Sequence, residues 1–254
     1  MFILVIIFTT KKLKMKFTYE SYKRMIESLR THGYEFAGYH DYEGNEKCVI
    51  LRHDIDNSIE KAVRLAEIEN EIGVRSTYFV LLTSDFYNVA SAKSLAGLKR
   101  IADLGHGIGL HFDEMAYPEE SRNDVPGLIK READILGQVL GMHIRSVSMH
   151  RPSKATLAAD YKIPGLVNSY GQIFFHDFKY LSDSRRRWRE PVLDIISKEE
   201  ALRLHILTHA IWYNEQEETI AETLSKFITA ANHERYLTEK DNITDLESIL
   251  ESVQ

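Results

Sequence analysis

Short apolar runs alternate with helix-length stretches of regularly spaced apolar residues along nearly the whole chain of 254 residues. This alternation is typical of βαβ units, which form a parallel sheet with helices outside it. The expected strands comprise residues 47–51, 76–82, 107–112, 144–149 and 204–207. The expected helices comprise residues 18–32, 57–73, 92–104, 124–141 and 217–231. About six or seven strands of this kind would form either a barrel or a doubly wound sheet.

Capping residues mark the ends of several expected helices. Thr18 is the expected N-cap of the first helix, and Asn57 is that of the second, with Glu60 as its capping-box partner. Asp124 is expected to begin the helix that Gly141 ends. The last helix is expected to bury its apolar stripe, which consists of Ile220, Leu224, Phe227, Ile228 and Ala231. Residues 164–191 show a weak pattern, so only short strands and loops are expected there.

The composition limits the kinds of site that this chain can build. Cys48 is the single cysteine, so an internal disulfide and a four-thiolate zinc site are both excluded. Any metal ion must therefore be held by His, Asp or Glu. The formal net charge of −6 argues against a nucleic-acid-binding protein, which usually carries a basic surplus. No linker divides the chain, so residues 15–254 are expected to form a single domain.

The first residues need a separate interpretation. Residues 1–8 are all apolar, and four lysines follow them: Lys11, Lys12, Lys14 and Lys16. Eight apolar residues are too few to span a membrane, which takes about 20, and a secretory signal carries its positive charge before the apolar run. Residues 1–14 are therefore interpreted as a non-native start upstream of Met15, a disordered or edge-strand tail, or a weak membrane anchor. The protein is expected to be cytoplasmic, without stable membrane insertion.

Polar side chains that could carry chemistry gather where the expected strands end. In both candidate architectures the active site lies at the carboxyl ends of the strands. The first strand leads into a segment with Asp54 and Asp56, whose side chains point the same way in an extended chain. Two such carboxylates repel each other, and a divalent cation removes this cost by pairing with one of them. The alternative is that one Asp caps the helix that follows.

Histidines occupy the ends of three further strands. His111 closes the third expected strand, His150 follows the fourth, and His209 follows the strand at residues 204–207. His106 lies five residues before His111, so at most one of the two can face a common site from a regular strand. Carboxylate and neutral imidazole are suitable ligands for zinc and similar ions. The shared position of these residues at strand ends therefore predicts a metal site.

Four motifs occur in an order that is found in a known family. They are the segment from His53 to Asp56, the segment from Gly105 to His111, the pair Arg151–Pro152, and the segment from Leu207 to His209. Over about residues 47–213, this pattern resembles the polysaccharide deacetylase superfamily, the NodB-like proteins of carbohydrate esterase family 4. The resemblance implies a catalytic, distorted (β/α) barrel with about seven parallel strands and helices outside. It also implies metal-dependent hydrolysis of an acetyl group on a sugar, with zinc as the expected divalent metal.

The resemblance also implies roles for individual residues. Asp54 corresponds to the catalytic base, and Asp56 corresponds to the first metal ligand. His111 corresponds to the first histidine ligand, since it follows the Gly-His-x-Ile-Gly run as that ligand does. His209 corresponds to the general acid that protonates the leaving amine. The implied centre therefore combines a metal, a base and an acid.

Two positions of the family pattern can be matched to this sequence in more than one way. In the Arg-Pro element, the arginine that orients the base corresponds either to Arg151 or to His150. The family's second histidine ligand, four residues after the first, falls on Met115, which is a poor ligand for a hard or borderline ion. We expect His150 to substitute as the metal ligand, and Asp113 and Glu114 are the alternatives.

The substrate contacts are the least defined part of the pattern. The family's fourth element, an Asp-Trp segment, has its nearest counterpart around Asp183 and Trp188. The candidate substrate-binding residues are His53, Asp183, Trp188 and Trp212. Asp183 is alternatively the partner of the base-side arginine. The run Arg185–Arg187 is either a solvated loop or a contact for an anionic or nucleotide-linked sugar.

The expected function is removal of an acetyl group from an amino sugar of a bacterial surface polysaccharide or of its soluble or lipid-linked precursor. The expected partner is thus a carbohydrate and not a nucleic acid. Two alternatives remain open. One is a non-catalytic relative that binds glycans without a complete metal site, and the other is a metal hydrolase that acts on another C–N amide bond. The fold alone does not decide among them.

Overall fold

The computed structural model describes residues 14–251, which fall into two compact units divided after Glu215. The apolar run at residues 1–8 and the lysines up to Lys12 lie outside the described residues. The second unit consists of α8 (Ile220–Asn242) and α9 (Leu246–Glu251). The first unit carries the sheet and every candidate site residue. No helix among the described residues is long and apolar enough to cross a membrane.

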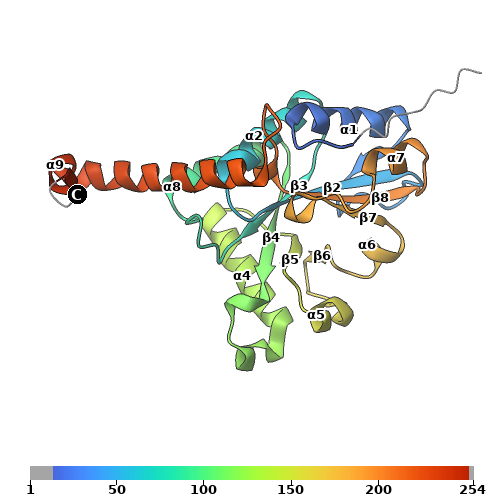
Figure 1. The fold of residues 1–254 in the computed structure, drawn as a ribbon. Coiled ribbons are helices and arrows are strands. Elements are labelled where there is room, and N and C mark those ends of the chain that lie inside the picture. The colour runs from blue at the N-terminus through green and yellow to red at the C-terminus, as the bar shows by residue number, and fades with distance from the viewer. Residues whose placement is uncertain (1–13, 252–254) are drawn as a thin grey trace, which may run out of the picture. The chain divides into compact units, whose positions relative to one another are not determined.

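An all-parallel sheet of eight strands forms the centre of the first unit. The strands are β1 (Glu35–Ala37), β2 (Cys48–Ile55), β3 (Thr77–Leu81), β4 (Gly107–Asp113), β5 (Ser146–His150), β6 (Val167–Asn168), β7 (Lys179–Ser182) and β8 (Arg203–Thr208). Seven of them follow the order β6-β5-β4-β3-β2-β8-β7, and β1 pairs with β2 beside this path. The sheet curls into a half-barrel, which confirms the predicted distorted (β/α) barrel (Figure 1).

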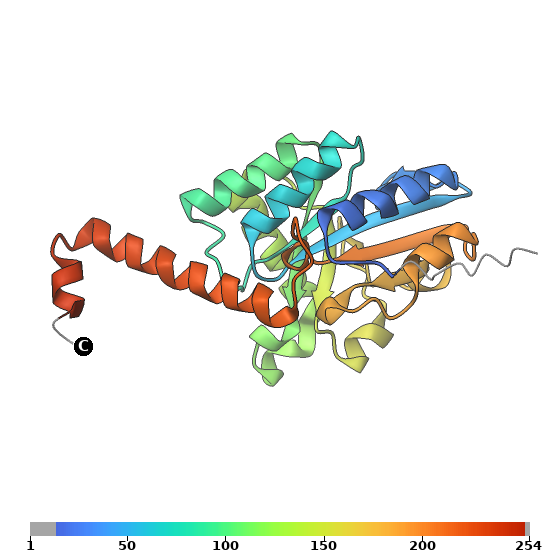
Figure 2. The same ribbon diagram turned by 45° about the horizontal axis from the view of Figure 1, so that its top comes forward.

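Helices surround this half-barrel on both of its faces. They are α1 (Tyr19–Thr31), α2 (Ile59–Glu71), α3 (Ala92–Asp103), α4 (Val125–Leu140), α5 (Lys154–Ala159), α6 (Ile173–His176) and α7 (Val192–Ser197). Four 3-10 helices connect other elements: η1 (Glu114–Ala116), η2 (Glu119–Asp124), η3 (Ser184–Arg186) and η4 (Ala210–Trp212). In Figure 1, α1 and α2 lie above the sheet, and α5 and α6 lie below it. Figure 2 shows α2 and α3 running side by side.

The helix boundaries follow the predicted caps closely. The hydroxyl of Thr18 accepts a hydrogen bond from the Ser21 amide at the start of α1, as predicted. Gly141 ends α4 in the left-handed conformation, with φ of 69°. The N-cap of α2 is Ser58 instead of the predicted Asn57, because the Ser58 hydroxyl accepts the bond from the Lys61 amide.

Helix α8 differs from its prediction in length and in burial. It begins after a capping box of Thr219 and Glu222 and continues to Asn242. None of the five residues of its predicted apolar stripe is buried, and Ile220 and Ile228 are 44% and 58% exposed. The predicted burial of this stripe is therefore wrong. The physical reason is that α8 belongs to the second unit, whose other helix has only six residues.

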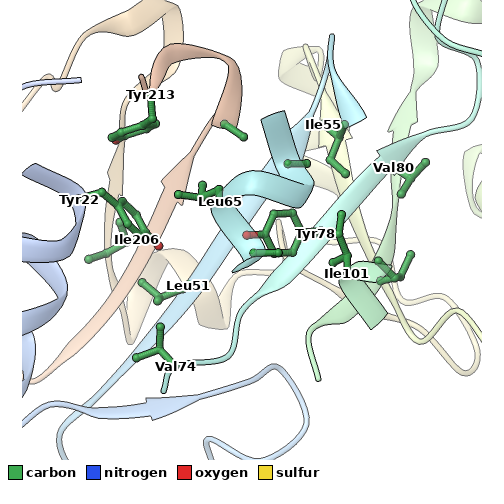
Figure 3. Close-up of a cluster of buried hydrophobic side chains, with 14 of the residues drawn as sticks. Tyr22, Leu51, Ile55, Leu65, Val74, Tyr78, Val80, Ile101, Ile206 and Tyr213 are labelled. Atoms are coloured by element: carbon green, nitrogen blue, oxygen red, sulfur yellow. The ribbon is translucent and has the colours of Figure 1, made fainter. Parts of the chain in front are cut away.

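The outer face of the sheet packs against the helices through alternate strand residues. On β2, Leu51 and Ile55 point to this face, where they meet Tyr22 of α1 and Leu65 of α2 (Figure 3). Tyr78 of β3 lies in the same layer. Because successive side chains on a strand alternate between faces, the intervening residues of β2 point into the half-barrel. The outer layer thereby fixes which residues of β2 can reach the site.

A buried carboxylate joins the outer face of the sheet to α2. Glu69 accepts hydrogen bonds from Tyr22 (2.5 Å), Tyr78 (2.8 Å) and Ser76 (2.6 Å), and it contacts His53 Nε2 at 2.9 Å. Burial raises the pKa of Glu69, but the contact with His53 and the other donors outweigh burial and lower it to about 2. Glu69 is therefore ionised at neutral pH and satisfies several buried donors at once.

His53 belongs to this outer network and not to the site. Its Nδ1 lies 2.6 Å from the Thr208 hydroxyl, and its Nε2 lies 2.9 Å from Glu69. The side chain is 1% exposed. The expectation that His53 contacts substrate is therefore wrong. It follows Arg52 and precedes Asp54 on a regular strand, so it must face away from both.

We predict that Glu69→Gln destabilises the fold by about 2–4 kcal/mol at pH 7, because an amide in this position cannot accept from every donor and the hydroxyls left unpaired remain buried. Urea unfolding measures the change. Glu71→Gln on the same helix is the control, since Glu71 is exposed and the substitution removes only its 3.8 Å contact with Lys23. That control should change stability by less than about 0.5 kcal/mol. Equal effects of the two substitutions would contradict the prediction.

The same substitution should also change the response to acid. The folded-state pKa of Glu69 lies below its ordinary value of 4.5, so its ionised form stabilises the fold fully above about pH 4.5. This contribution is lost as the pH falls toward about 2. The difference in stability between wild type and Glu69→Gln should therefore shrink over this range.

Candidate metal centre

Three potential metal ligands converge at the carboxyl ends of three strands. Asp56 directly follows β2, His111 lies on β4, and His150 ends β5. One ligand atom from each residue lies within 4.8 Å of the other two. The Asp56 Oδ1 atom is 3.2 Å from His111 Nε2 and 3.4 Å from His150 Nδ1, and the two nitrogens are 3.1 Å apart. These are the three residues that the sequence predicts as ligands.

The spacing of these atoms fits a tetrahedrally bound ion. Two N or O ligands at 2.0–2.1 Å from a tetrahedral Zn²⁺ are about 3.3 Å apart, close to all three separations in the cluster. The Asp56 Oδ1 atom is buried and has no hydrogen-bond partner among the described residues. Without a cation or a proton between them, the lone pairs of these atoms repel one another. One carboxylate and two imidazoles are a suitable ligand set for zinc.

Neighbouring strands orient His111. Its Nδ1 lies 2.6 Å from the hydroxyl of Ser148 on β5, which leaves Nε2 directed at the cluster. Two residues earlier on β4, a Cβ on Gly109 would lie 2.4 Å from a ring carbon of Phe79 and 2.7 Å from the Ser146 hydroxyl. Only glycine therefore fits there, and β4 can lie close enough to β3 and β5 for the site to form.

A second carboxylate lies on β2, two residues before Asp56 and farther inside the half-barrel. Asp54 accepts two hydrogen bonds from the guanidinium of Arg52, from Nε at 2.9 Å and from a terminal nitrogen at 2.7 Å. Burial raises the pKa of Asp54, but the Arg52 charge outweighs burial and holds it below its usual range. The Asp54 Oδ2 atom lies 3.6 Å from His111 Nε2. Asp54 is thus an ionised carboxylate beside the three-ligand cluster.

Arg52, which the sequence analysis did not single out, takes the position that was expected for Arg151. Its side chain is fully buried and also donates to the Ser169 hydroxyl at 3.2 Å. The Arg151 guanidinium instead binds Asp113 at 2.6 Å, and its side chain is 67% exposed. The expected contact of Arg151 with the base is therefore not formed. The available signal was the alternation on β2, which places residue i−2 on the same face as Asp54.

The other candidates for the third ligand are engaged elsewhere. Asp113 accepts hydrogen bonds from Arg151 and from the Met115 amide. Glu114 accepts from the Thr156 hydroxyl at 2.5 Å and from the Ser153 amide. The Met115 side chain is 55% exposed. Among the described residues, the cluster of ligand atoms contains His150 and neither of the two acidic alternatives.

His209, which is half-buried, and the fully buried Asp183 form a pair on the far side of the cluster. The Nδ1 of His209, just after β8, lies 2.6 Å from Asp183 Oδ1, just after β7. Its Nε2 lies 3.8 Å from Asp56 Oδ2. Burial lowers the pKa of His209, but the hydrogen bond and charge of Asp183 outweigh burial and raise it to about 9. His209 is therefore protonated at neutral pH.

The remaining substrate-contact predictions have different outcomes. Asp183 is fully buried behind His209, so it cannot touch a substrate, and it does not bind an arginine in place of His209. Trp188 and Trp212 are half-buried and pack against the main hydrophobic core. Each indole nitrogen is buried without a hydrogen-bond partner among the described residues. Their contact with a sugar stays a prediction.

Solved structures with a similar fold include members of carbohydrate esterase family 4. A mutant of a Bacillus anthracis pseudoenzyme of this family, with restored enzymatic activity, is 16% identical with a TM-score of 0.45. The match covers 75% of this chain and 64% of that chain, so this chain spans less than two thirds of its length. Two other similar structures belong to the same family.

The first is the family 4 domain of a multidomain xylanase from the hindgut metagenome of Trinervitermes trinervoides. It is 14% identical, with a TM-score of 0.44 and coverage of 78% of this chain and 93% of that chain. The second is a family 4 carbohydrate esterase from Bacillus anthracis. It is 19% identical, with a TM-score of 0.43 and coverage of 82% and 85%. No protein-family model and no curated protein matches this chain.

We predict that in metal-free protein the His209 imidazole titrates near pH 9 and that Asp183→Asn lowers this midpoint by at least about one pH unit, because a charge and its hydrogen bond are lost. Two-dimensional NMR of the histidine rings measures both values. His205 is the internal control, since burial lowers its pKa to about 3 and its signals should not move between pH 6 and 10. An unchanged His209 midpoint in Asp183→Asn would contradict this account.

Proposed function

We propose that this chain is a metal-dependent hydrolase that removes an acetyl group from an amino sugar. One observation carries the proposal: three ligand atoms within 4.8 Å of one another lie between an arginine-bound carboxylate and an aspartate-bound imidazolium. The two flanking groups, Asp54 and His209, have opposite charges and protonation states at neutral pH. Paired acid and base groups of this kind suit the hydrolysis of an amide.

The metal would be held by Asp56, His111 and His150. A bound divalent ion supplies Lewis-acid polarisation of the acetyl carbonyl and lowers the pKa of a water molecule toward neutrality. Three protein ligands leave a tetrahedral ion one open position, which is typical of catalytic zinc sites. The hydrogen bond from His111 to Ser148 would fix the ring so that its Nε2 faces the ion as a ligand.

Asp54 and His209 divide the proton transfers between them. As the water oxygen forms a bond to the acetyl carbon, Asp54 takes the water proton, and the two bonds from Arg52 keep this carboxylate ionised and oriented. The bond between the acetyl carbon and the sugar nitrogen then breaks. His209 gives its Nε2 proton to that nitrogen, so the products are acetate and a free amine. Asp183 binds Nδ1 and thereby fixes the orientation of the ring. This orientation sets the direction in which Nε2 gives its proton.

The substrate class within this proposal is an acetylated amino sugar of a bacterial surface polysaccharide or of its precursor. It is supported by the order of the motifs around Asp54, His111 and His209, which resembles that of polysaccharide deacetylases. A cytoplasmic location stays a prediction, as does zinc as the ion.

We predict that purified wild-type protein binds about one equivalent of Zn²⁺ or Co²⁺ and that His150→Ala and His111→Ala each weaken binding more than about a hundredfold, since even residues behind the ligands are worth 10–100-fold. Elemental mass spectrometry of untagged protein and titration with Co²⁺, followed by its visible spectrum, measure this. His143→Ala, an exposed histidine before β5, is the control and should bind like wild type. Unchanged binding in His150→Ala would overturn the ligand set.

We predict that Asp54→Asn lowers acetate release from acetylated amino sugars by about 10²–10⁴-fold while metal stays bound, because a general base contributes that much. Asp56→Ala should lose both metal and activity. Acetate is measured by an enzyme-coupled assay, and metal is measured in parallel. Turnover of Asp54→Asn near the wild-type rate would refute the assigned roles.

Two other results would replace the proposed function. If wild type binds no metal and releases no acetate but still binds glycans, it is a non-catalytic binding protein. If it binds metal and hydrolyses other amides while leaving acetylated sugars intact, it is a hydrolase of another class.

A further inference from the structure

The loop after β7 is rich in arginine, and its side chains alternate between exposed and half-buried positions. Arg185, Arg187 and Arg189 are exposed. Between them, Arg186 and Trp188 are half-buried, and the Arg186 guanidinium lies 4.8 Å from the centre of the Phe17 ring. The two half-buried residues anchor the loop to the core, so the arginines on either side of Arg186 must point outward.

The backbone of this loop is unfavourable for the residues that it carries. Arg185 and Arg186 both have positive φ angles, 58° and 54°, in the left-handed region that L residues with a Cβ avoid. Two consecutive non-glycine residues in this region persist only when the surrounding structure holds them there. Such strain occurs most often at active sites and ligand clamps. The loop therefore holds Arg185 in a conformation that a simple solvated loop would not require.

The exposed arginines of the loop have no acidic partner within the part of the chain that the structure describes. The nearest carboxylates in sequence are engaged elsewhere, since Asp183 binds His209 and Glu190 binds Lys179 at 2.5 Å. No ion pair joins Arg185, Arg187 or Arg189 to any described carboxylate. The chain as a whole carries a net charge of −6. Local cationic charge of this kind raises the concentration of anions near it.

The loop also begins at the site itself. Asp183 binds the proposed general acid His209 at 2.6 Å, and Arg185 follows Asp183 by two residues. Two peptide units span at most about 7.6 Å between Cα atoms. The loop leaves the carboxyl end of the sheet, where Asp56, His111 and His150 also lie. Arg185 is therefore within two residues of the carboxylate that holds His209, at the end of the sheet where the site lies.

We propose that the amino sugar substrate carries an anionic group, a phosphate or a carboxylate, and that Arg185 and Arg187 bind this group. Guanidinium groups bind either oxyanion through paired hydrogen bonds, which suits them to this role better than lysine. This inference rests on the proposed function and adds the chemical class of the sugar. Arg186 and Trp188 act as positioning residues that set the loop.

The test compares neutral and anionic substrates on the metal-loaded full chain. The probes are N-acetylglucosamine, its 1-phosphate, its 6-phosphate, and the carboxylate-bearing N-acetylmuramic acid. At least one anionic probe should have a kcat/KM more than about tenfold above that of the neutral sugar, mainly through KM, as one charged hydrogen-bonded contact provides. The comparison of the two phosphate probes with the carboxylate probe identifies which oxyanion is bound. Equal kcat/KM for all four probes would overturn the inference and leave the proposed function standing.

Variants assign the preference to the loop. In the double variant Arg185→Gln, Arg187→Gln, the ratio of anionic to neutral kcat/KM should fall about tenfold to a hundredfold. Arg145→Gln, an exposed arginine before the opposite end of β5, is the matched control and should keep the wild-type ratio. A ratio that stays unchanged in the double variant would refute the role of these arginines.

A binding measurement separates this inference from the failure of the proposed function. If no probe releases acetate although metal is bound, the proposed function fails, and calorimetry with N-acetylglucosamine 1-phosphate and N-acetylmuramic acid still tests the loop. Binding of either anion that weakens at least about tenfold in the double variant supports the anion site. Affinities that are the same in wild type and the double variant, or no binding of either anion, overturn it.

Discussion

The ion pair of Arg52 and Asp54 determines what the interior of this half-barrel can contain. A fully buried guanidinium is tolerated only with a charged, geometrically matched partner, and here a carboxylate on the same strand accepts two of its hydrogen bonds. The planar cation also lies 5.3 Å from the Phe79 ring and 4.8 Å from the Tyr170 ring. The pair keeps a carboxylate ionised where burial would favour its protonated form. Along one face of β2, the chain thus presents a cation, then an ionised carboxylate, then at the rim the carboxylate of the three-ligand cluster.

Two other ionisable groups of the site are held by a residue from an adjacent strand. Ser148 of β5 orients His111 of β4, and Asp183 after β7 orients His209 after β8. On the outer face, the network of Glu69 and His53 satisfies its own donors behind the sheet. Strand alternation separates these two polar systems, although residues 52, 53 and 54 are consecutive. The outer network therefore holds the strand that carries the site from the opposite face of the sheet.

The sequence allowed five of the eight described strands, most of the predicted helix caps and all three cluster residues to be predicted, because these follow from local periodicity and from the meeting of parallel strand ends. His53 was misplaced although alternation relative to Asp54 would have placed it correctly. The pairing of Asp183 with His209 could not be derived, because it depends on β7 lying beside β8 across 26 residues of sequence. Arg52 was missed because a charged residue within an apolar strand gains its meaning only from its partner. The stripe of α8 was misjudged because periodicity identifies an apolar face but not what covers it.

The charges of the site connect the metal with the proposed anionic substrate. The carboxylates of Asp54, Asp56 and Asp183 face two cations, Arg52 and the protonated His209, which leaves one excess negative charge. In that state the site repels an anionic sugar. A divalent ion held by Asp56, His111 and His150 would reverse the sign and leave one excess positive charge, and the unpaired arginines after β7 would then extend a field of the same sign outward. The metal would thus do more than activate water, since it would also decide whether a charged substrate can approach the arginine loop at all.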